Sequence, residues 1–289
     1  MGSRQVVTDI DDTIKSSGGL ALGGIPLGGV DTSYARDTFY PGVFQFGLEL
    51  ACSGVRLPGA VPPKVAVLTA RAEEFRFALE IRESDELCAR FREAGESRGL
   101  RDWGVGPVLY GSVAEWVCQE RKGQRKRENF RLLRSAAKRP ARSRYIFIGD
   151  NGASEKDLEA AQLIVSDFPG SLKAVFLHAV AADASQPAPL AEDADIDGVP
   201  LLYYRTYPTA AVKAARLGLL SRLAALRVLH AAEEDLARLD DAACPAASRL
   251  LLLDEIAVAR RDLERAPAWL LRTVRARRRR PGPGRSSSP

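Results

Sequence analysis

The sequence has few of the residues from which several common kinds of site are built. Its 289 residues include two histidines and four cysteines. The histidines, His178 and His230, lie far apart and match no metal-binding spacing, so we expect each to serve packing or the surface. The cysteines show no paired spacing, which argues against a disulfide framework and favours a reducing compartment.

Long hydrophobic runs are also absent. No apolar run approaches the roughly 20 residues that span a bilayer. The first expected strand begins near residue 4, so we expect no signal peptide ahead of it. We therefore expect a cytoplasmic protein, which can still bind a membrane peripherally. The glycine-rich span 16–29 lacks the Gly-Lys-Ser/Thr of a P-loop and is not a dinucleotide fingerprint.

Acidic residues directly follow the first hydrophobic segment. Residues 6–8 form a β-branched stretch typical of a buried strand, and Asp9, Asp11 and Asp12 come next. One residue separates Asp9 from Asp11, so both carboxylates can turn toward a common point beyond the strand. Carboxylates this close repel one another unless a cation or a shared proton relieves them, and Mg²⁺ is a suitable cation. The alternative is that these residues only cap a turn.

Two further hydrophobic segments end abruptly in polar groups. Residues 65–68 lead into Thr69, and residues 145–148 lead through a glycine into Asp150. Between them, residues 121–130 are typical of the basic start of a helix. In an open parallel sheet, ligands bind beyond the carboxyl ends of the strands. The polar groups are therefore expected to converge there.

Strand-like and helix-like segments alternate along the chain. Strands are expected near residues 4–8, 65–69, 107–110, 145–149 and 173–177. Helices are expected at residues 70–79, 157–163, 209–239 and 248–265, with a proline-marked surface loop at 183–200. This alternation predicts an α/β fold with a doubly wound, mostly parallel sheet.

The order of these segments resembles the haloacid-dehalogenase (HAD) superfamily of phosphotransferases. The motifs are closer still to one branch, the phosphatidate phosphatases related to the yeast actin-patch protein. The segments that carry the resemblance are VVTDIDDTIKSSGG (6–19), DTFYPGVFQFGLEL (37–50), VLTAR (67–71), RKGQRKRENF (121–130) and FIGDNG (147–152). RTYPTAAVKA (205–214) resembles that branch more loosely, and the whole resemblance covers residues 4–230.

The resemblance implies a magnesium-dependent phosphatase that works through an aspartyl-phosphate. Asp9 would be the nucleophile, and Asp11 would protonate the leaving alkoxide and then activate water. Thr69 would bind a phosphate oxygen, and Lys126 would stabilise the charge on the transferring group. Mg²⁺ would be held by Asp9, the backbone carbonyl of Asp11, and Asp150.

Two assignments keep an alternative. Lys122 competes with Lys126, which is preferred because the family places its lysine just before an Asn-Phe pair, here residues 129–130. The second aspartate of the last motif is absent from its usual position. Glu155 or Asp157 would take its place beside the metal, or would instead cap the following helix.

The residues around the acidic motif receive lesser roles. Thr13 is expected to fix the loop, and Asp12, facing the turn or the substrate entrance, is given no chemical step. The glycine-rich segment that follows resembles a flap or small cap (16–45), and a short one leaves room for a bulky head group.

Charge is uneven along the chain. Residues 272–289 hold seven arginines and no acidic residue, and without these arginines the formal charge changes from +5 to −2. We expect a phosphatase core at 1–207, helices packed on it at 208–271, and a disordered tail at 272–289. The basic segments suit an anionic lipid surface, and the chain carries no dedicated nucleic-acid motif.

The expected reaction is the hydrolysis of phosphatidate to diacylglycerol and phosphate. Phosphatases of this superfamily act on many substrates, so a soluble phosphate ester or a phosphoprotein is the nearest alternative. A catalytically silent relative that binds membranes or other anions is the second alternative.

Overall fold

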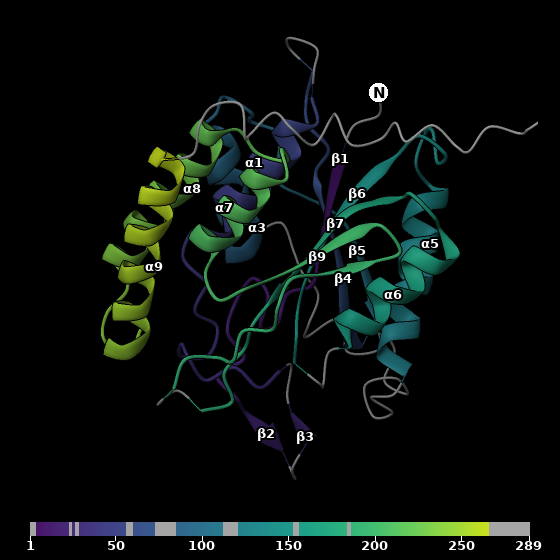
Figure 1. The fold of residues 1–289 in the computed structure, drawn as a ribbon. Coiled ribbons are helices and arrows are strands. Elements are labelled where there is room, and N and C mark those ends of the chain that lie inside the picture. The colour runs from purple at the N-terminus through teal and green to yellow at the C-terminus, as the bar shows by residue number, and fades with distance from the viewer. Residues whose placement is uncertain are drawn as a thin grey trace, which may run out of the picture.

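A mostly parallel sheet of seven strands forms the centre of the fold (Figure 1). The computed structural model describes residues 4–22, 25–26, 29–55, 60–72, 85–111, 121–152, 156–183 and 186–265. The strands of the sheet are β1 (Arg4–Thr8), β4 (Val65–Ala72), β5 (Val105–Gly111), β6 (Arg144–Asp150), β7 (Leu172–His178), β8 (Ala194–Ile196) and β9 (Val199–Tyr204). The predicted α/β class and mostly parallel sheet are confirmed, because β8 alone of these strands runs antiparallel to its neighbour.

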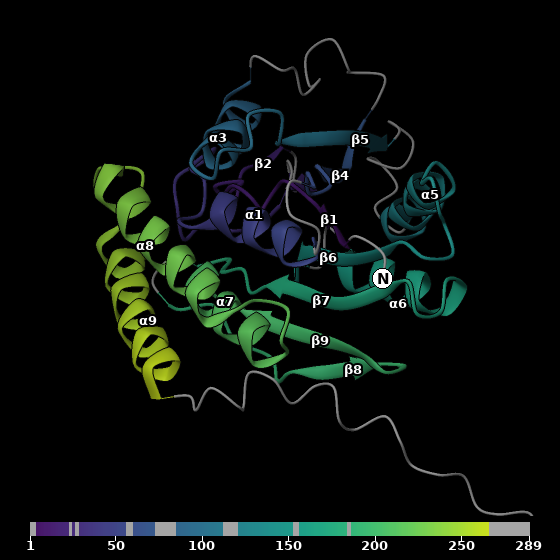
Figure 2. The same ribbon diagram turned by 90° about the horizontal axis from the view of Figure 1, so that it is seen from above.

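Seven helices in the described part of the chain cover the two faces of the sheet. They are α1 (Val43–Ser53), α3 (Glu86–Glu96), α5 (Lys122–Ser135), α6 (Asp157–Asp167), α7 (Tyr207–Arg216), α8 (Arg222–Arg238) and α9 (Ala246–Arg265). Figure 2 shows α5 and α6 on one face and the other five helices on the opposite face. This layering follows from side-chain alternation, because Val6 packs into the cluster beneath α1 and α8, whereas Val7 packs beneath α5 and α6.

Strand β1 lies at the point where the strand order reverses: β4 and β5 lie on one side of it, and the later strands lie on the other. The order is β5-β4-β1-β6-β7-β9-β8. Thr8 at the end of β1 lies opposite Val67 of β4 and Ile148 of β6, both in parallel. Ligands of doubly wound sheets bind in the crevice beyond the carboxyl ends of the strands at such a switch point. The residues at the carboxyl ends of β1 and β6 therefore lie where a ligand of such a sheet would bind.

A separate two-stranded antiparallel sheet follows β1. It consists of β2 (Ala21–Leu22) and β3 (Ile25–Pro26), with Ala21 opposite Pro26. Figure 1 shows this pair beyond the carboxyl end of the large sheet, on the side where β1 and β6 end. The glycine-rich segment thus lies at the same end of the molecule as the predicted site.

The structure corrects several of the predicted boundaries. The loop predicted at 183–200 is wrong from residue 194 onward, because β8 and the start of β9 lie there. Pro200 suggested a loop, but it stands at the start of β9, before the pairing with β7 begins at Leu201, where a proline is tolerated. The helix predicted at 209–239 is two helices, separated near Gly218, whose φ of 68° ends the first.

The other helices vary in how well they were predicted. The helices predicted at 157–163 and 248–265 are confirmed as α6 and α9, and each extends slightly further. The helix predicted at 70–79 is wrong for residues 70–72, which belong to β4, and its remaining residues lie outside the described part. No helix of the described chain is long and apolar enough to cross a bilayer.

A buried carboxylate joins three helical segments on one face of the sheet. Glu49 of α1 is 2% exposed, and Arg227 of α8 binds it through two hydrogen bonds of 2.6 and 2.7 Å. Arg98, which follows α3, donates a third at 2.6 Å. Charged hydrogen bonds to a buried acceptor are stronger than those on the surface. This cluster therefore fixes α1, α8 and the end of α3 relative to one another.

We expect Glu49→Gln to lower the free energy of unfolding by about 2 kcal/mol, because it removes the charge that both arginines share. The matched control is Glu93→Gln, which changes an exposed acid paired with Arg90 at 3.0 Å. This control should cost less than about 0.5 kcal/mol. Urea unfolding of both variants measures the difference, and equal losses would show that the cluster does not stabilise the fold.

Candidate active site

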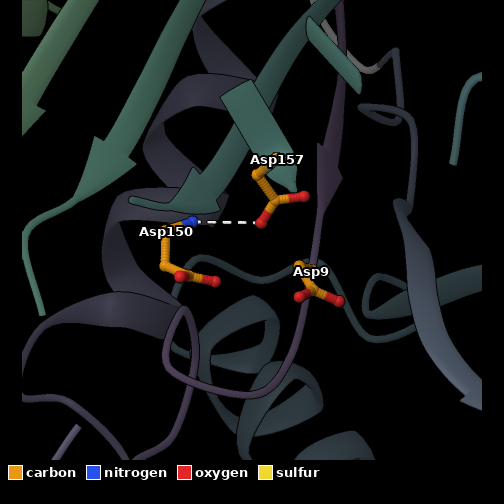
Figure 3. Close-up of side chains that lie close together, drawn as sticks. All are labelled: Asp9, Asp150 and Asp157. Atoms are coloured by element: carbon orange, nitrogen blue, oxygen red, sulfur yellow. Dashed lines mark hydrogen bonds between the residues drawn. The ribbon is translucent and has the colours of Figure 1, made fainter. Parts of the chain in front are cut away.

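Three buried aspartates meet at the carboxyl ends of β1 and β6. Asp9 directly follows β1, Asp150 ends β6, and Asp157 begins α6. One carboxylate oxygen of each lies within 4.8 Å of the others, and each residue is 1% exposed. Figure 3 shows the three side chains gathered around one point, with the backbone N–H of Asp150 donating to the Asp157 carboxylate. The distance between this nitrogen and Asp157 Oδ2 is 3.1 Å.

Lys126 reaches this cluster from α5. Its Nζ lies 3.0 Å from Asp9 Oδ2 and 2.7 Å from Asp157 Oδ1, and the residue is 1% exposed. The ammonium group therefore joins the carboxylate after β1 to the one that starts α6. Lys122, the alternative, is buried one turn earlier on the same helix. The geometry favours Lys126 as the lysine of the cluster.

Two glycines allow the backbone to approach the carboxylates. A Cβ at Gly149 would lie 2.4 Å from Asp157 Oδ2, and one at Gly152 would lie 2.7 Å from Asp150 Oδ1. The N–H of Gly152 uses this closeness to donate to Asp150 Oδ1 at 2.6 Å. In the Gly-Asp-Asn-Gly sequence at the end of β6, the two glycines thus allow the backbone to pack against the acids where a side chain would not fit.

The cluster has the composition of a site for a divalent cation. Within the described residues, three buried carboxyl groups gather here and the ammonium group of Lys126 contacts two of them, so a bound cation would relieve their mutual repulsion. Carboxylate oxygens are the ligands that hard cations such as Mg²⁺ prefer, although they do not single out Mg²⁺ among them. Asp9, Asp150 and Asp157 therefore fit a metal of this kind.

The other residues predicted for the site differ in where the structure places them. Asp11 lies two residues beyond Asp9, and its side-chain carboxylate is not one of the three that gather. Thr69 is buried in β4, the other neighbour of β1, and lies inside the strand instead of at its end as expected. Of the two candidates for the second acid, Asp157 belongs to the cluster, and Glu155 lies outside the described residues.

Asp12 is a part of the site whose structural role the sequence did not indicate. Its carboxylate accepts the backbone N–H of Ser17 at 2.8 Å, of Val30 at 2.6 Å and of Asp31 at 2.8 Å. It is fully buried, and its backbone is left-handed with φ of 56°. Burial raises the pKa of Asp12 to about 6, while the hydrogen bonds from Ser17 and Asp31 oppose that rise.

His178 and Tyr207 bind the backbone carbonyl groups of the acidic loop that follows β1. The ring nitrogens of His178 lie 2.7 Å from the carbonyl oxygen of Asp12 and 2.9 Å from that of Arg205. The hydroxyl of Tyr207 donates to the carbonyl of Thr13 at 2.6 Å. Sequence reasoning expected a packing role for His178 and none for Tyr207. Tyr207 lies in segment 205–214, and the loose resemblance of this segment to the family motifs was the sequence feature that could have indicated a role for it.

A cavity of about 270 Å³ opens beside the cluster. Asp150 and Asp157 form part of its wall, and Asn151, Lys156 and Gln162 are among the other residues that line it. A cavity needs only about 10–15 Å³ on this measure to hold one water molecule, so the space has room for several. Asp150 and Asp157 are therefore buried in the protein but lie against this space, whereas Asp9 is not among its lining residues.

The chain was compared with protein-family models, with curated proteins and with solved structures, and no match was found.

Binding of a divalent cation should raise the melting temperature of the wild-type protein. We expect an increase of about 3–8 °C when Mg²⁺ is present at a hundredfold excess over its dissociation constant. Asp150→Asn should lose this increase, because one of the three oxygen ligands loses its charge. Thermal unfolding with Mg²⁺ and with EDTA measures both.

The control for this experiment is Asp102→Asn, which alters an exposed aspartate. It should keep the full increase. In EDTA, Asp150→Asn should melt no lower than wild type, because it removes one of three repelling charges. An undiminished Mg²⁺ effect in Asp150→Asn would contradict a metal site at the cluster.

Proposed function

We propose that this chain is a metal-dependent phosphohydrolase of the HAD type that transfers the phosphoryl group to Asp9. The observation that carries the proposal is the cluster of Asp9, Asp150 and Asp157 joined by Lys126 at the end of the central strand. A nucleophilic carboxylate next to a buried cation and two further acids suits attack on an anionic ester. The DxDxT order of the acidic motif supports the same class.

The reaction begins with Asp9, whose carboxylate oxygen attacks phosphorus. A bond forms between this oxygen and phosphorus while the ester P–O bond breaks, and Asp11 gives its proton to the departing alkoxide. A water molecule then attacks the phosphorus of the aspartyl-phosphate and gives its proton to Asp11. Phosphate leaves, and the Asp9 carboxylate is restored.

The other residues stabilise charge during these steps. Lys126 stabilises the negative charge that builds on the transferring group, and Thr69 donates a hydrogen bond to a phosphate oxygen. Asp9, Asp150 and the Asp11 carbonyl, with Asp157 alongside, would hold a Mg²⁺ ion, which would supply positive charge to offset the negative charge that the phosphate and the nucleophile share. Burial of the cluster strengthens all of these interactions, because little water screens them.

Phosphatidate is the substrate that we propose within this class. The motifs resemble the phosphatidate phosphatases over residues 4–230. The β2-β3 pair beyond the end of the sheet is the proposed flap. Such a short element leaves room for the head group of a lipid that stays in its membrane.

An anionic membrane surface is the partner that this substrate requires. Three large apolar side chains of α9 are exposed, namely Leu250 (68%), Leu253 (47%) and Val258 (41%). The sequence that follows α9 contains Trp269 and then the seven arginines of residues 272–289. Exposed apolar side chains on a helix followed by a basic segment are typical of proteins that bind membranes at the interface. We propose a cytoplasmic enzyme that binds membranes peripherally.

Asp9→Asn should abolish turnover, because it removes the nucleophile and changes the side-chain volume very little. We expect phosphate release to fall about 1,000-fold or more. The assay compares wild type and variant on phosphatidate in mixed micelles and on a soluble aryl phosphate, each with and without Mg²⁺. Phosphate release by the variant at the wild-type rate would contradict the mechanism.

The two substrates separate the alternatives. Wild-type release from the aryl phosphate alone would move the assignment to a soluble phosphate ester. Release from neither substrate, together with Mg²⁺ binding, would favour a catalytically silent relative that binds anions.

Deletion of residues 272–289 should weaken binding to anionic vesicles and leave hydrolysis of the aryl phosphate unchanged. Each arginine near an anionic surface contributes about 1 kcal/mol, so the loss in co-sedimentation should exceed tenfold. Vesicles of neutral phosphatidylcholine serve as the control and should bind both forms weakly. Equal co-sedimentation of both forms with anionic vesicles at moderate salt would reject a membrane role for this segment.

A further inference from the structure

The two ends of the glycine-rich segment meet on one carboxylate. Residues 18–29, the main part of the glycine-rich span 16–29, include β2 and β3, and Ser17 and Val30 stand on either side of this part. The N–H of Ser17 donates to Asp12 Oδ1, whereas the N–H groups of Val30 and Asp31 both donate to Asp12 Oδ2. Asp12 therefore closes the segment into a loop at its base, three residues beyond the proposed nucleophile.

The base of this segment also lies against the metal-site loop. A Cβ at Gly152 would come within 3.6 Å of Val30 Cγ2 and 2.7 Å of Asp150 Oδ1, so Val30 packs beside the loop that presents Asp150. The position of Val30 is in turn set by its hydrogen bond to Asp12. A displacement of this arm would change the packing against Gly152, which lines the cavity next to the acid cluster.

A second set of hydrogen bonds ties the same arm to the loops after β6 and β7. Asp31 Oδ1 accepts the N–H of Ala181 at 3.0 Å, and Asn151 Oδ1 accepts the N–H of Val180 at 3.0 Å. Asn151 is the neighbour of Asp150. The arm that leaves the glycine-rich segment is thus linked through Asp31 and residues 180–181 back to the metal-site loop.

The backbone at Gly29 and Asp12 permits this close arrangement. A Cβ at Gly29 would lie 2.0 Å from Asp12 Oδ2, so only glycine allows the arm to come so close to the carboxylate. Asp12 itself adopts a left-handed backbone, which costs free energy for a residue with a side chain. Both features serve the contact between the carboxylate and the arm.

We propose that Asp12 is a positioning residue that clamps both ends of the glycine-rich segment and thereby holds the wall of the substrate entrance in place beside Asp150. Asp12 takes no part in bond making. It acts through the three N–H groups, and its effect on turnover depends on the phosphatase function proposed above, whereas its effect on the backbone does not.

Asp12→Asn tests the clamp because asparagine has the same shape but only one acceptor oxygen. Whichever way the amide turns, either Ser17 or the pair Val30 and Asp31 faces an NH₂ group instead of an acceptor. Hydrogen exchange resolved to single amides should therefore show about tenfold faster exchange on one side of the clamp. Wild-type exchange rates at all three amides would overturn the proposal.

Two further variants control this experiment. Asp37→Asn makes the same chemical change at an exposed aspartate whose backbone is also left-handed, with φ of 66°, and should leave the three amides unchanged. Gly29→Ala leaves Asp12 intact but forces the arm away, so exchange should speed up at Val30 and Asp31. Unchanged exchange in Gly29→Ala would also overturn the clamp.

Kinetics separate positioning from chemistry. With the aryl phosphate and Mg²⁺, Asp12→Asn should raise KM about tenfold and lower kcat by a smaller factor, because the entrance changes while the reacting groups stay. A loss confined to kcat, or no change in either constant, would contradict the positioning role. Were the wild type inactive, the exchange experiment would still decide the clamp, so failure of the two proposals can be told apart.

Discussion

Repulsion among three buried carboxylates is the constraint on which the rest of this structure depends. Asp9, Asp150 and Asp157 lie within 4.8 Å through one oxygen each, at the end of the central strands. Lys126 offsets part of the negative charge. By binding Asp9 and Asp157, it also fixes α5 to the carboxyl end of β1 and to α6. The remaining negative charge makes the site suitable for a hard divalent cation. Stability and function therefore compete at the same four side chains.

Backbone N–H groups and glycines supply the rest of the site. Gly149 and Gly152 let the chain pass close to the carboxylates, and Gly29 does the same at Asp12. At each of these glycines the absence of a side chain leaves room for the neighbouring carboxylate or for a main-chain N–H donor. The loop after β1, the loop after β6 and the glycine-rich segment are thus held by short contacts that a larger residue would break, which fixes their relative positions.

The sequence predicted those parts of the fold that have a local pattern. β1, β6, β7, α6 and α9 follow from hydrophobic period and from polar residues at strand ends. β9 was missed because Pro200 resembles a loop signal, and its position depends on pairing with β7, which is a long-range contact. Thr69 was placed at the end of a strand that in fact continues to Ala72, because Arg71 gives no sign that the pairing with β5 continues.

The candidate site was predictable in the same partial way. Asp9, Lys126 and Asp150 stand out as residue types after strands or on a basic helix, and the Asn-Phe pair at 129–130 already favoured Lys126 over Lys122. The choice of Asp157 over Glu155 needs the packing of α5 against α6. Asp12 carries no signal of its clamp, since its three donors lie up to 19 residues away along the chain. Interactions of this kind arise from tertiary structure alone.

Chemical trapping of the phosphoryl group on Asp9 tests the central claim most directly. The wild-type protein is mixed with phosphatidate and Mg²⁺, quenched within one turnover, reduced with borohydride, and digested for mass spectrometry. The account predicts a modified residue at Asp9 that appears and decays at the rate of phosphate release. Full phosphate release with an unmodified Asp9, or with the modification on another residue, would contradict it.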